Sequence, residues 1–164
     1  GAIRFDHELY RGTDALVIPD VFDGVLVTAL APKAFNGADF LRSVTLPASV
    51  TLIDERAFSG CTALEEINLS AKLERIAQNA FFGCKKLVSI SIPNGCTVIE
   101  PRAFNNCSAL ESVTLPSTLT EIGIYAFSNC DAIKTVNFDG TRERLFEICS
   151  PEGNESLLKE GNQK

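Results

Sequence analysis

The stretch "AFSGCTALEEINL" at residues 57–69 is written twice more in closely similar form. "AFFGCKKLVSISI" begins 23 residues later, at Ala80, and "AFNNCSALESVTL" begins a further 23 residues on, at Ala103. Each copy carries a phenylalanine, a cysteine and aliphatic residues at the same places. A fixed short period is typical of a solenoid, in which one unit cannot bury its apolar face alone and must stack on its neighbours.

The period of 23 residues runs without a gap from Leu30 to Phe138. Leucine, isoleucine and valine recur in phase with it, as does a column of five phenylalanines. We expect these columns to become buried ladders along the stack, with each phenylalanine contributing about 2 kcal/mol through burial. The phenylalanine column contains Phe35, Phe58, Phe81, Phe104 and Phe127.

The segment "LEEINL" at 64–69 predicts a short strand, because apolar Ile67 and Leu69 alternate with polar Glu66 and Asn68. Strands of successive turns then form a parallel sheet with rungs about 4.8 Å apart. A weaker second strand is predicted at 73–77 on the opposite flank, and "AFSGC" predicts a short helical turn. Glycine or asparagine recurs near the end of that turn, which predicts one left-handed residue per unit. These residues are Gly37, Gly60, Gly83, Asn106 and Asn129.

The two ends depart from the repeat, as caps must. We divide the chain into an N-terminal cap and partial repeat at 1–29, a solenoid at 30–139, and a C-terminal cap helix with a polar tail at 140–164. "IRFDHELY" is expected to add strand to the first cap. Leu145, Phe146, Ile148 and Cys149 have helix-like spacing, which predicts a short amphipathic helix that closes the core. The tail from residue 150 onward is expected to be loosely held.

Composition excludes several classes of protein. A length of 164 residues with 45% hydrophobic content predicts one folded domain. The net charge of −6 and the lack of a basic cluster argue against binding to nucleic acid or to an anionic membrane surface. The sequence contains no run of about 18 apolar residues, so it predicts no membrane-spanning helix. The chain begins with glycine and contains no methionine, so we expect its natural start to lie elsewhere.

The repeat resembles that of the BspA-like leucine-rich repeats, the bacterial class with 23-residue units. "CSALESVTLPSTLTEIGIYAF" at 107–127 matches the family phrase at every apolar position. "LVIPDVFDGVLVTALAPKAF" and "FDGTRERLFEI" are similar to the family's usual ends, so the resemblance covers about residues 13–148. It implies a right-handed solenoid, an exported protein of the bacterial cell surface, and a role in adhesion or protein binding. It transfers no catalytic residues.

The cysteines invite a metal or disulfide interpretation, but four of them repeat in phase with the apolar columns. A zinc site needs close pairs, whereas the nearest pair here, Cys96 and Cys107, is 11 residues apart. Stacked side chains also point in parallel, which disfavours disulfide geometry. We therefore expect buried free thiols and no metal or cofactor at Cys61, Cys84, Cys107 and Cys130. Cys149 lies off this ladder, and whether it is paired stays open.

Catalytic patterns are weak. His7 is the single histidine, and a Cys–His nucleophile pair would need Cys149 or another thiol brought to it across the caps. Neither a nucleophile elbow nor a phosphate-binding loop occurs. We predict that this protein is not an enzyme.

Two surfaces are candidates for binding. The first is an outward column of small, neutral side chains: Thr45, Asn68, Ser91, Thr114 and Asn137. It lacks the aromatic platforms that usually hold sugar rings, so a protein ligand is favoured, with a glycan as a possibility. The second is Phe82, which stands where other units have polar residues and is either an isolated exposed aromatic or an interface anchor. The alternative function is a structural spacer within a larger surface protein.

Overall fold

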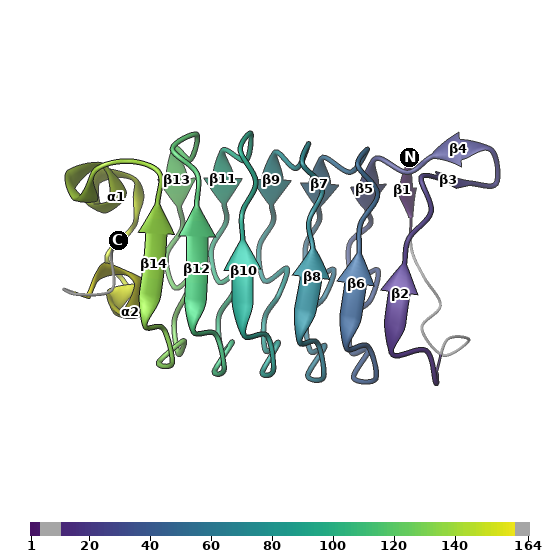
Figure 1. Ribbon diagram of the computed structural model, residues 1–164, viewed down its shortest axis with the longest axis horizontal. Helices are drawn as coiled ribbons and strands as arrows, with labels where there is room; N and C mark the ends of the chain where they lie inside the picture. The colour runs from purple at the N-terminus through teal and green to yellow at the C-terminus, as the bar shows by residue number, and fades with distance from the viewer. Residues whose placement is uncertain (4–10, 160–164) are drawn as a thin grey trace.

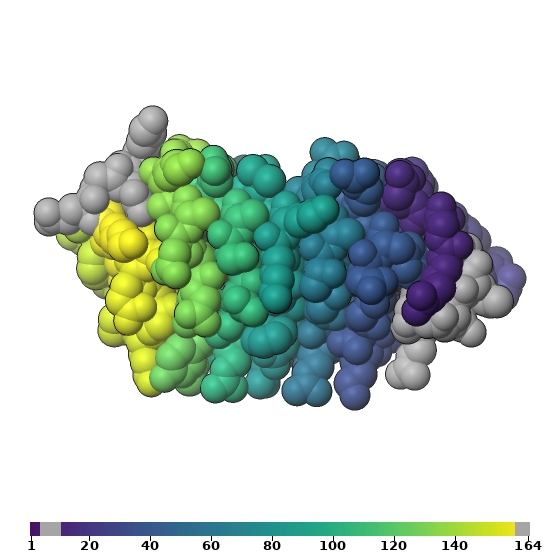
Figure 2. All heavy atoms as spheres, turned by 90° about the horizontal axis from the view of Figure 1, so that it is seen from below, coloured from purple at the N-terminus to yellow at the C-terminus, as the bar shows by residue number. Residues whose placement is uncertain are grey.

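The computed structural model is an elongated stack of turns, with β1 (Ala2–Ile3) and β2 (Ala15–Val17) at one end and the helices α1 (Arg142–Ile148) and α2 (Glu155–Leu158) at the other (Figure 1). It describes residues 1–3 and 11–159, so the expected strand in "IRFDHELY" and the position of His7 fall largely or wholly outside the described residues. Successive units form adjacent bands in chain order along the rod, as Figure 2 shows from below. The predicted repeat solenoid is confirmed.

One side of the rod is built from the longer strand of each turn. These strands are β2 (Ala15–Val17), β6 (Ser43–Thr45), β8 (Glu66–Asn68), β10 (Ser89–Ser91), β12 (Ser112–Leu115) and β14 (Thr135–Phe138). All pairings are parallel, and from β6 onward they join residues 23 apart, so Val113 lies opposite Val136, its equivalent one unit later. Parallel stacking of equivalent residues is the reason why each apolar column becomes a ladder.

This strand side is not the single sheet that we expected. It consists of two sheets with the orders β2-β6-β8 and β10-β12-β14. Between β8 and β10 the described residues form no strand pairing, although a long bond joins the Val88 N–H to the Glu65 carbonyl at 3.4 Å. Leu69, which follows β8, stays only partly buried, whereas its equivalents Leu46 and Ile92 are buried.

The opposite side carries the predicted second strand of each unit. Six two-residue strands form one parallel sheet in the order β1-β5-β7-β9-β11-β13. They are β1 (Ala2–Ile3), β5 (Ala29–Leu30), β7 (Leu52–Ile53), β9 (Arg75–Ile76), β11 (Val98–Ile99) and β13 (Glu121–Ile122). A parallel bridge from Ile122 to Cys149 continues this sheet into the C-terminal cap.

The "AFSGC" segment forms the expected short turn, without a regular helix. Its bonds link residues three apart, for example Ser59 N–H to the Arg56 carbonyl at 3.1 Å and Cys61 N–H to the Phe58 carbonyl at 3.2 Å. The predicted left-handed glycines and asparagines are confirmed, with φ from 57° to 77°. A second left-handed column was not predicted: Lys33, Arg56, Asn79, Arg102 and Tyr125, with φ from 55° to 60°. Two left-handed residues in each segment interrupt any helix.

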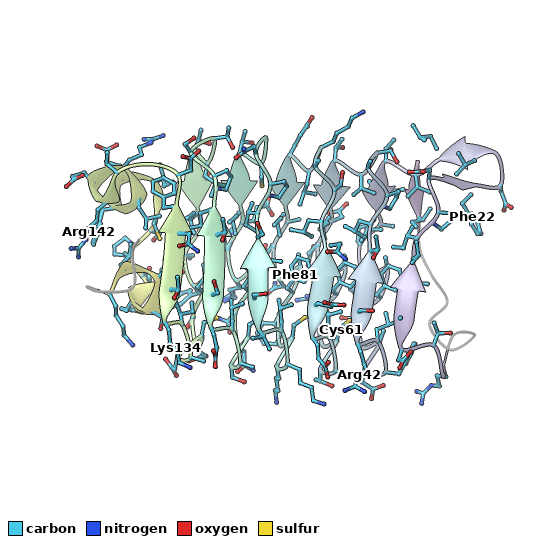
Figure 3. The ribbon with its side chains drawn as sticks, viewed as in Figure 1. Phe22, Arg42, Cys61, Phe81, Lys134 and Arg142 are labelled. Atoms are coloured by element: carbon cyan, nitrogen blue, oxygen red, sulfur yellow. The ribbon has the colours of Figure 1, made fainter. Side chains whose placement is uncertain are left out.

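The core of the rod is a stack of phenylalanine rings. The rings from Phe35 to Phe127 are separated by 5.0–5.3 Å between neighbouring centroids and are parallel within 12°. Figure 3 shows Phe81 and Cys61 in the interior. All five rings are at most 2% exposed, which confirms the predicted spine.

The repeated cysteines lie beside this stack and each donates its thiol to the preceding turn. Cys61 bonds the Phe35 carbonyl at 3.1 Å, and Cys107 bonds the Phe81 carbonyl at 3.2 Å. Cys84 and Cys130 repeat the contact at 3.3 and 3.1 Å. The column therefore selects a small apolar side chain that also carries a donor. All six cysteines are buried and free.

The N-terminal end carries a hairpin formed by residues that interrupt the repeat. Strands β3 (Val21–Phe22) and β4 (Val25–Leu26) are antiparallel, and their four side chains are each about half exposed. Figure 3 shows Phe22 at this end of the rod.

The C-terminal end is closed by two helices. The predicted helix is α1 (Arg142–Ile148), which buries Leu145 and Ile148 against the last turn. Phe146 was expected to join them but points outward, with the Arg142 guanidinium 5.3 Å from its ring centroid. The expectation of a loose tail from residue 150 is wrong for the described part, because α2 (Glu155–Leu158) packs with Leu157 fully buried. Residues 160–164 lie outside the described residues.

Candidate binding surfaces

The predicted outward column lies on the strand side of the rod. Asn68 and Ser91 are exposed, whereas Thr45, Thr114 and Asn137 are partly buried. The Asn68 amide donates to Thr45 Oγ1 at 3.4 Å, and the Asn137 amide donates to Thr114 Oγ1 at 3.5 Å. Because β8 and β10 are not paired, the row consists of a group of two residues and a group of three.

Charged side chains next to this row are paired between turns. Arg42 contacts Glu65 at 2.8 Å, and Lys134 contacts Glu111 at 2.9 Å, each pair joining residues 23 apart. The Arg42 hydrogen bond lowers the pKa of the Glu65 carboxyl. Figure 3 shows Arg42 and Lys134 along the same edge of the rod. A partner that docks on the strand side therefore meets hydroxyl and amide groups, with few unpaired charges.

Phe82 lies among the turns that follow the "AFSGC" pattern, here called the turn side, and the residue is 37% exposed, as predicted. The structure adds a hollow of about 310 Å³ beside it, which the sequence analysis missed. The hollow is lined by Arg56, Ser59, Gln78, Asn79, Phe82 and Arg102. The signal that could have revealed it is the residue type in one column, where a short asparagine separates two arginines.

The two arginines of the hollow differ in their contacts. The Arg102 guanidinium lies over the Tyr125 ring at 5.4 Å and forms no ion pair with any described residue. The Arg56 guanidinium has a loose contact with Glu55 at 3.7 Å, and both side chains are about half exposed. Positive charge at the hollow is therefore only weakly compensated.

A second acidic group near the hollow is already engaged. The Glu100 carboxylate accepts from the Gln78 backbone N–H at 2.8 Å and from Arg75 Nε at 2.6 Å. These bonds engage the Glu100 carboxylate with Gln78 and Arg75, and it forms no ion pair with Arg56 or Arg102.

The cysteines offer little chemistry in this arrangement. Burial raises the pKa of the Cys61 and Cys149 thiols to about 12 and that of Cys96 to about 11. Burial also raises the pKa of Cys107, and its thiol in turn raises the pKa of Cys130. A protonated, buried thiol is a poor nucleophile and a poor metal ligand. The pairing of a cysteine with His7 involves a residue outside the described part of the chain.

Metal-ligating groups do not gather in the described chain. Across residues 1–3 and 11–159, no cluster of three or more His, Cys, Asp or Glu side chains is placed to hold a metal ion. In the same residues, neither helix has the length and apolar character needed to cross a membrane.

Comparison with known proteins adds the family. The family described as BspA type Leucine rich repeat region matches residues 28–150 in six copies. A crystal structure of the T. pallidum leucine-rich repeat protein TpLRR is 40% identical, with a TM-score of 0.74 over 76% of this chain and 58% of that one. A leucine-rich cell surface protein from Faecalibacterium prausnitzii is 34% identical, with a TM-score of 0.75 over 84% of this chain and 35% of that one.

A more distant structure shows the fold alone. The pneumococcal vaccine antigen PcpA is 19% identical, with a TM-score of 0.67 over 93% of this chain and 40% of that one. The search of curated proteins gave no match. This chain thus spans less than two thirds of the length of each of the three solved structures described.

Proposed function

Because this chain belongs to the BspA-type leucine-rich repeat family, we propose that it is a non-enzymatic recognition module that binds a protein partner. The observation that carries the proposal is the strand side. Small polar side chains are presented there on parallel strands in two in-register groups: Thr45 with Asn68, and Ser91 with Thr114 and Asn137. Groups that are already ordered lose little conformational entropy when a partner docks.

A protein partner suits this surface better than a glycan. Hydroxyl and amide groups can bond to backbone and side chains of a docked protein, whereas no aromatic ring stands in the row to stack on a sugar. Arg42 and Lys134 beside the row are paired with Glu65 and Glu111, and Glu66 is the single charged residue within the strands of this side, so binding should depend weakly on salt.

We further propose that the protein acts at the bacterial cell surface, with adhesion as the role that recognition would serve. The F. prausnitzii structure, at 34% identity, is of a protein described as a cell surface protein. That likeness supports the location of this chain, and the exposed polar face supports contact with another protein.

The test is capture of a partner by the intact chain. Immobilised protein would be incubated with surface extracts of bacterial and host cells, and retained proteins would be identified by mass spectrometry. A protein retained by the native chain and lost with Ser91→Arg supports the proposal. Retention of glycans alone, or steady turnover in a broad hydrolase screen, would contradict it.

A structural spacer is the second candidate. One observation favours it: the chain spans 35–58% of the related structures above 30% identity, so a rod of this kind can be one segment of a larger protein. A spacer predicts no specific retention from any extract, together with normal folding of the isolated chain.

A further inference from the structure

We propose that the hollow beside Phe82 binds an acidic peptide segment of a partner protein, with two carboxylate side chains three residues apart and an apolar side chain between them. The inference extends the proposed recognition function to a second surface. This surface lies on the turn side, so a failure here leaves the strand side untouched.

The shape of the hollow follows from one column of the repeat. Arg56, Asn79 and Arg102 occupy equivalent places in three consecutive turns, and all three have left-handed backbone. Asn79 is short and only 8% exposed, whereas the arginines on either side are long and exposed. The short side chain of Asn79 therefore leaves a depression between the two arginines. Phe82, from the same turn as Asn79, forms one wall of this hollow.

The charge of the hollow selects an anion. Arg102 has no carboxylate partner among the described residues, and Arg56 has only the loose contact with exposed Glu55. Guanidinium groups bind carboxylates through charge-assisted and often bidentate hydrogen bonds. In a chain of net charge −6, two weakly compensated arginines around an aromatic ring are a local reversal of the general charge.

The spacing of the arginines selects a peptide in the polyproline II conformation. Arg56 and Arg102 are two turns apart, and neighbouring turns are about 5 Å apart, in keeping with ring separations of 5.3 and 5.0 Å in the core between them. A peptide in the polyproline II conformation has three residues per turn and rises about 3.1 Å per residue, so side chains at positions i and i+3 lie on the same side, about 9 Å apart, close to the span of two turns. An apolar side chain between the carboxylates would then rest on Phe82.

The test uses the full chain and two short peptides. The probe is the acetylated tetrapeptide amide Glu-Leu-Leu-Glu, and the neutral control is Gln-Leu-Leu-Gln. Binding would be followed by changes in the amide signals of the ¹⁵N-labelled protein. Addition of the acidic probe should shift signals from residues 78–83 and from Arg102, and the neutral peptide should shift them little.

Variants separate the hollow from general charge attraction. Arg102→Gln should weaken binding of the acidic probe about tenfold, because it removes a charge-assisted contact. Lys72→Gln makes the same change of charge at an exposed site outside the hollow, and it should alter binding by less than about twofold. Phe82→Ala should also weaken binding, and Glu55→Gln should strengthen it by removing a competing carboxylate.

Three results would overturn the inference. They are the absence of localised shifts with the acidic probe, equal weakening by Lys72→Gln and Arg102→Gln, and equal binding of the acidic peptide and trigalacturonate. The last result would assign the hollow to acidic sugars. If a partner captured by the native chain binds Arg102→Gln equally well, the hollow is not its site, and the proposed recognition function still stands.

Discussion

The side chain of Asn154 accepts the backbone N–H of Phe127 at 2.8 Å and occupies the place of a missing turn. In inner turns the same N–H finds the alanine carbonyl of the next unit, as Phe81 does with Ala103 at 2.7 Å. The Asn154 amide also donates to the Gly123 and Ser150 carbonyls at 2.9 and 2.7 Å. One fully buried side chain thus satisfies three backbone groups at the open end of the stack.

Asn154→Ala should therefore destabilise the protein by about 2–4 kcal/mol, because it leaves buried backbone groups without partners. Urea unfolding followed by circular dichroism measures the change. Asn36→Ala removes an exposed asparagine from the first turn and should cost less than about 0.5 kcal/mol. Similar losses at both sites would show that Asn154 does not close the stack.

The phenylalanine spine gives a second prediction. Phe81→Ala opens a cavity between two parallel rings and should cost roughly 3–5 kcal/mol. Phe82→Ala changes the adjacent, partly exposed residue and should cost less than about 0.5 kcal/mol. Thermal and urea unfolding measure the stability of both variants. Equal losses of stability would refute the assignment of Phe81 to the core and Phe82 to the surface.

The buried thiols predict a loss of stability at high pH. An unfolded thiol ionises near pH 9, whereas the folded Cys61 thiol has a pKa of about 12. Above pH 9 the unfolded state binds fewer protons, so stability is full below that pH and falls as the pH rises towards 12. For Cys61 alone the loss between pH 8 and 10.5 is about 2 kcal/mol. Cys61→Ala, which copies Ala38 in the first unit, should reduce the fall by that amount. An unchanged pH dependence in this variant would contradict the prediction.

The second left-handed column predicts opposite effects of glycine at two nearby positions. Lys33 has φ of 60°, so Lys33→Gly relieves backbone strain and should stabilise the protein by about 0.5–1 kcal/mol. Asn36 does not have positive φ, so Asn36→Gly should destabilise by about 0.5–1 kcal/mol. Melting temperatures should move in opposite directions, and a shift of the same sign would argue against the strain.

Recognition through the strand side predicts a clean separation of binding from folding. Ser91→Arg places a long charged side chain in the middle of the polar row and should abolish capture of a partner bound there. Because Ser91 is exposed, the free energy of unfolding of the variant should lie within about 0.5 kcal/mol of that of the native protein. Pull-down and urea unfolding of the same preparation test both halves. A partner that binds the variant normally, and is lost with Phe82→Ala, would move the site to the turn side.

Much of the fold could be predicted because equivalent positions in successive units share the same structural environment and therefore carry similar residues. Phe58 and Phe81 meet the same environment, so period alone reveals their burial. Arg56 and Tyr125 hold left-handed backbone without glycine, because bonds from their N–H groups to the next turn or cap fix them, and residue type gives no sign of this. Asn154 lies outside the repeat and has no equivalent in other units. The open end of the stack that it closes exists only in the folded structure, so the sequence pattern does not reveal its role. The break between β8 and β10 has no counterpart in the spacing of the sequence.

The bond from each phenylalanine N–H to the following alanine carbonyl is the same at every inner turn, and Asn154 reproduces it for the last one. Neither end of the rod therefore depends on how many turns lie between them. Duplication or deletion of one 23-residue unit would leave all remaining joints intact and change the length by about 5 Å. The length of the rod is therefore set by the number of repeat units, and unequal crossing-over within the gene could change that number without disturbing the two caps.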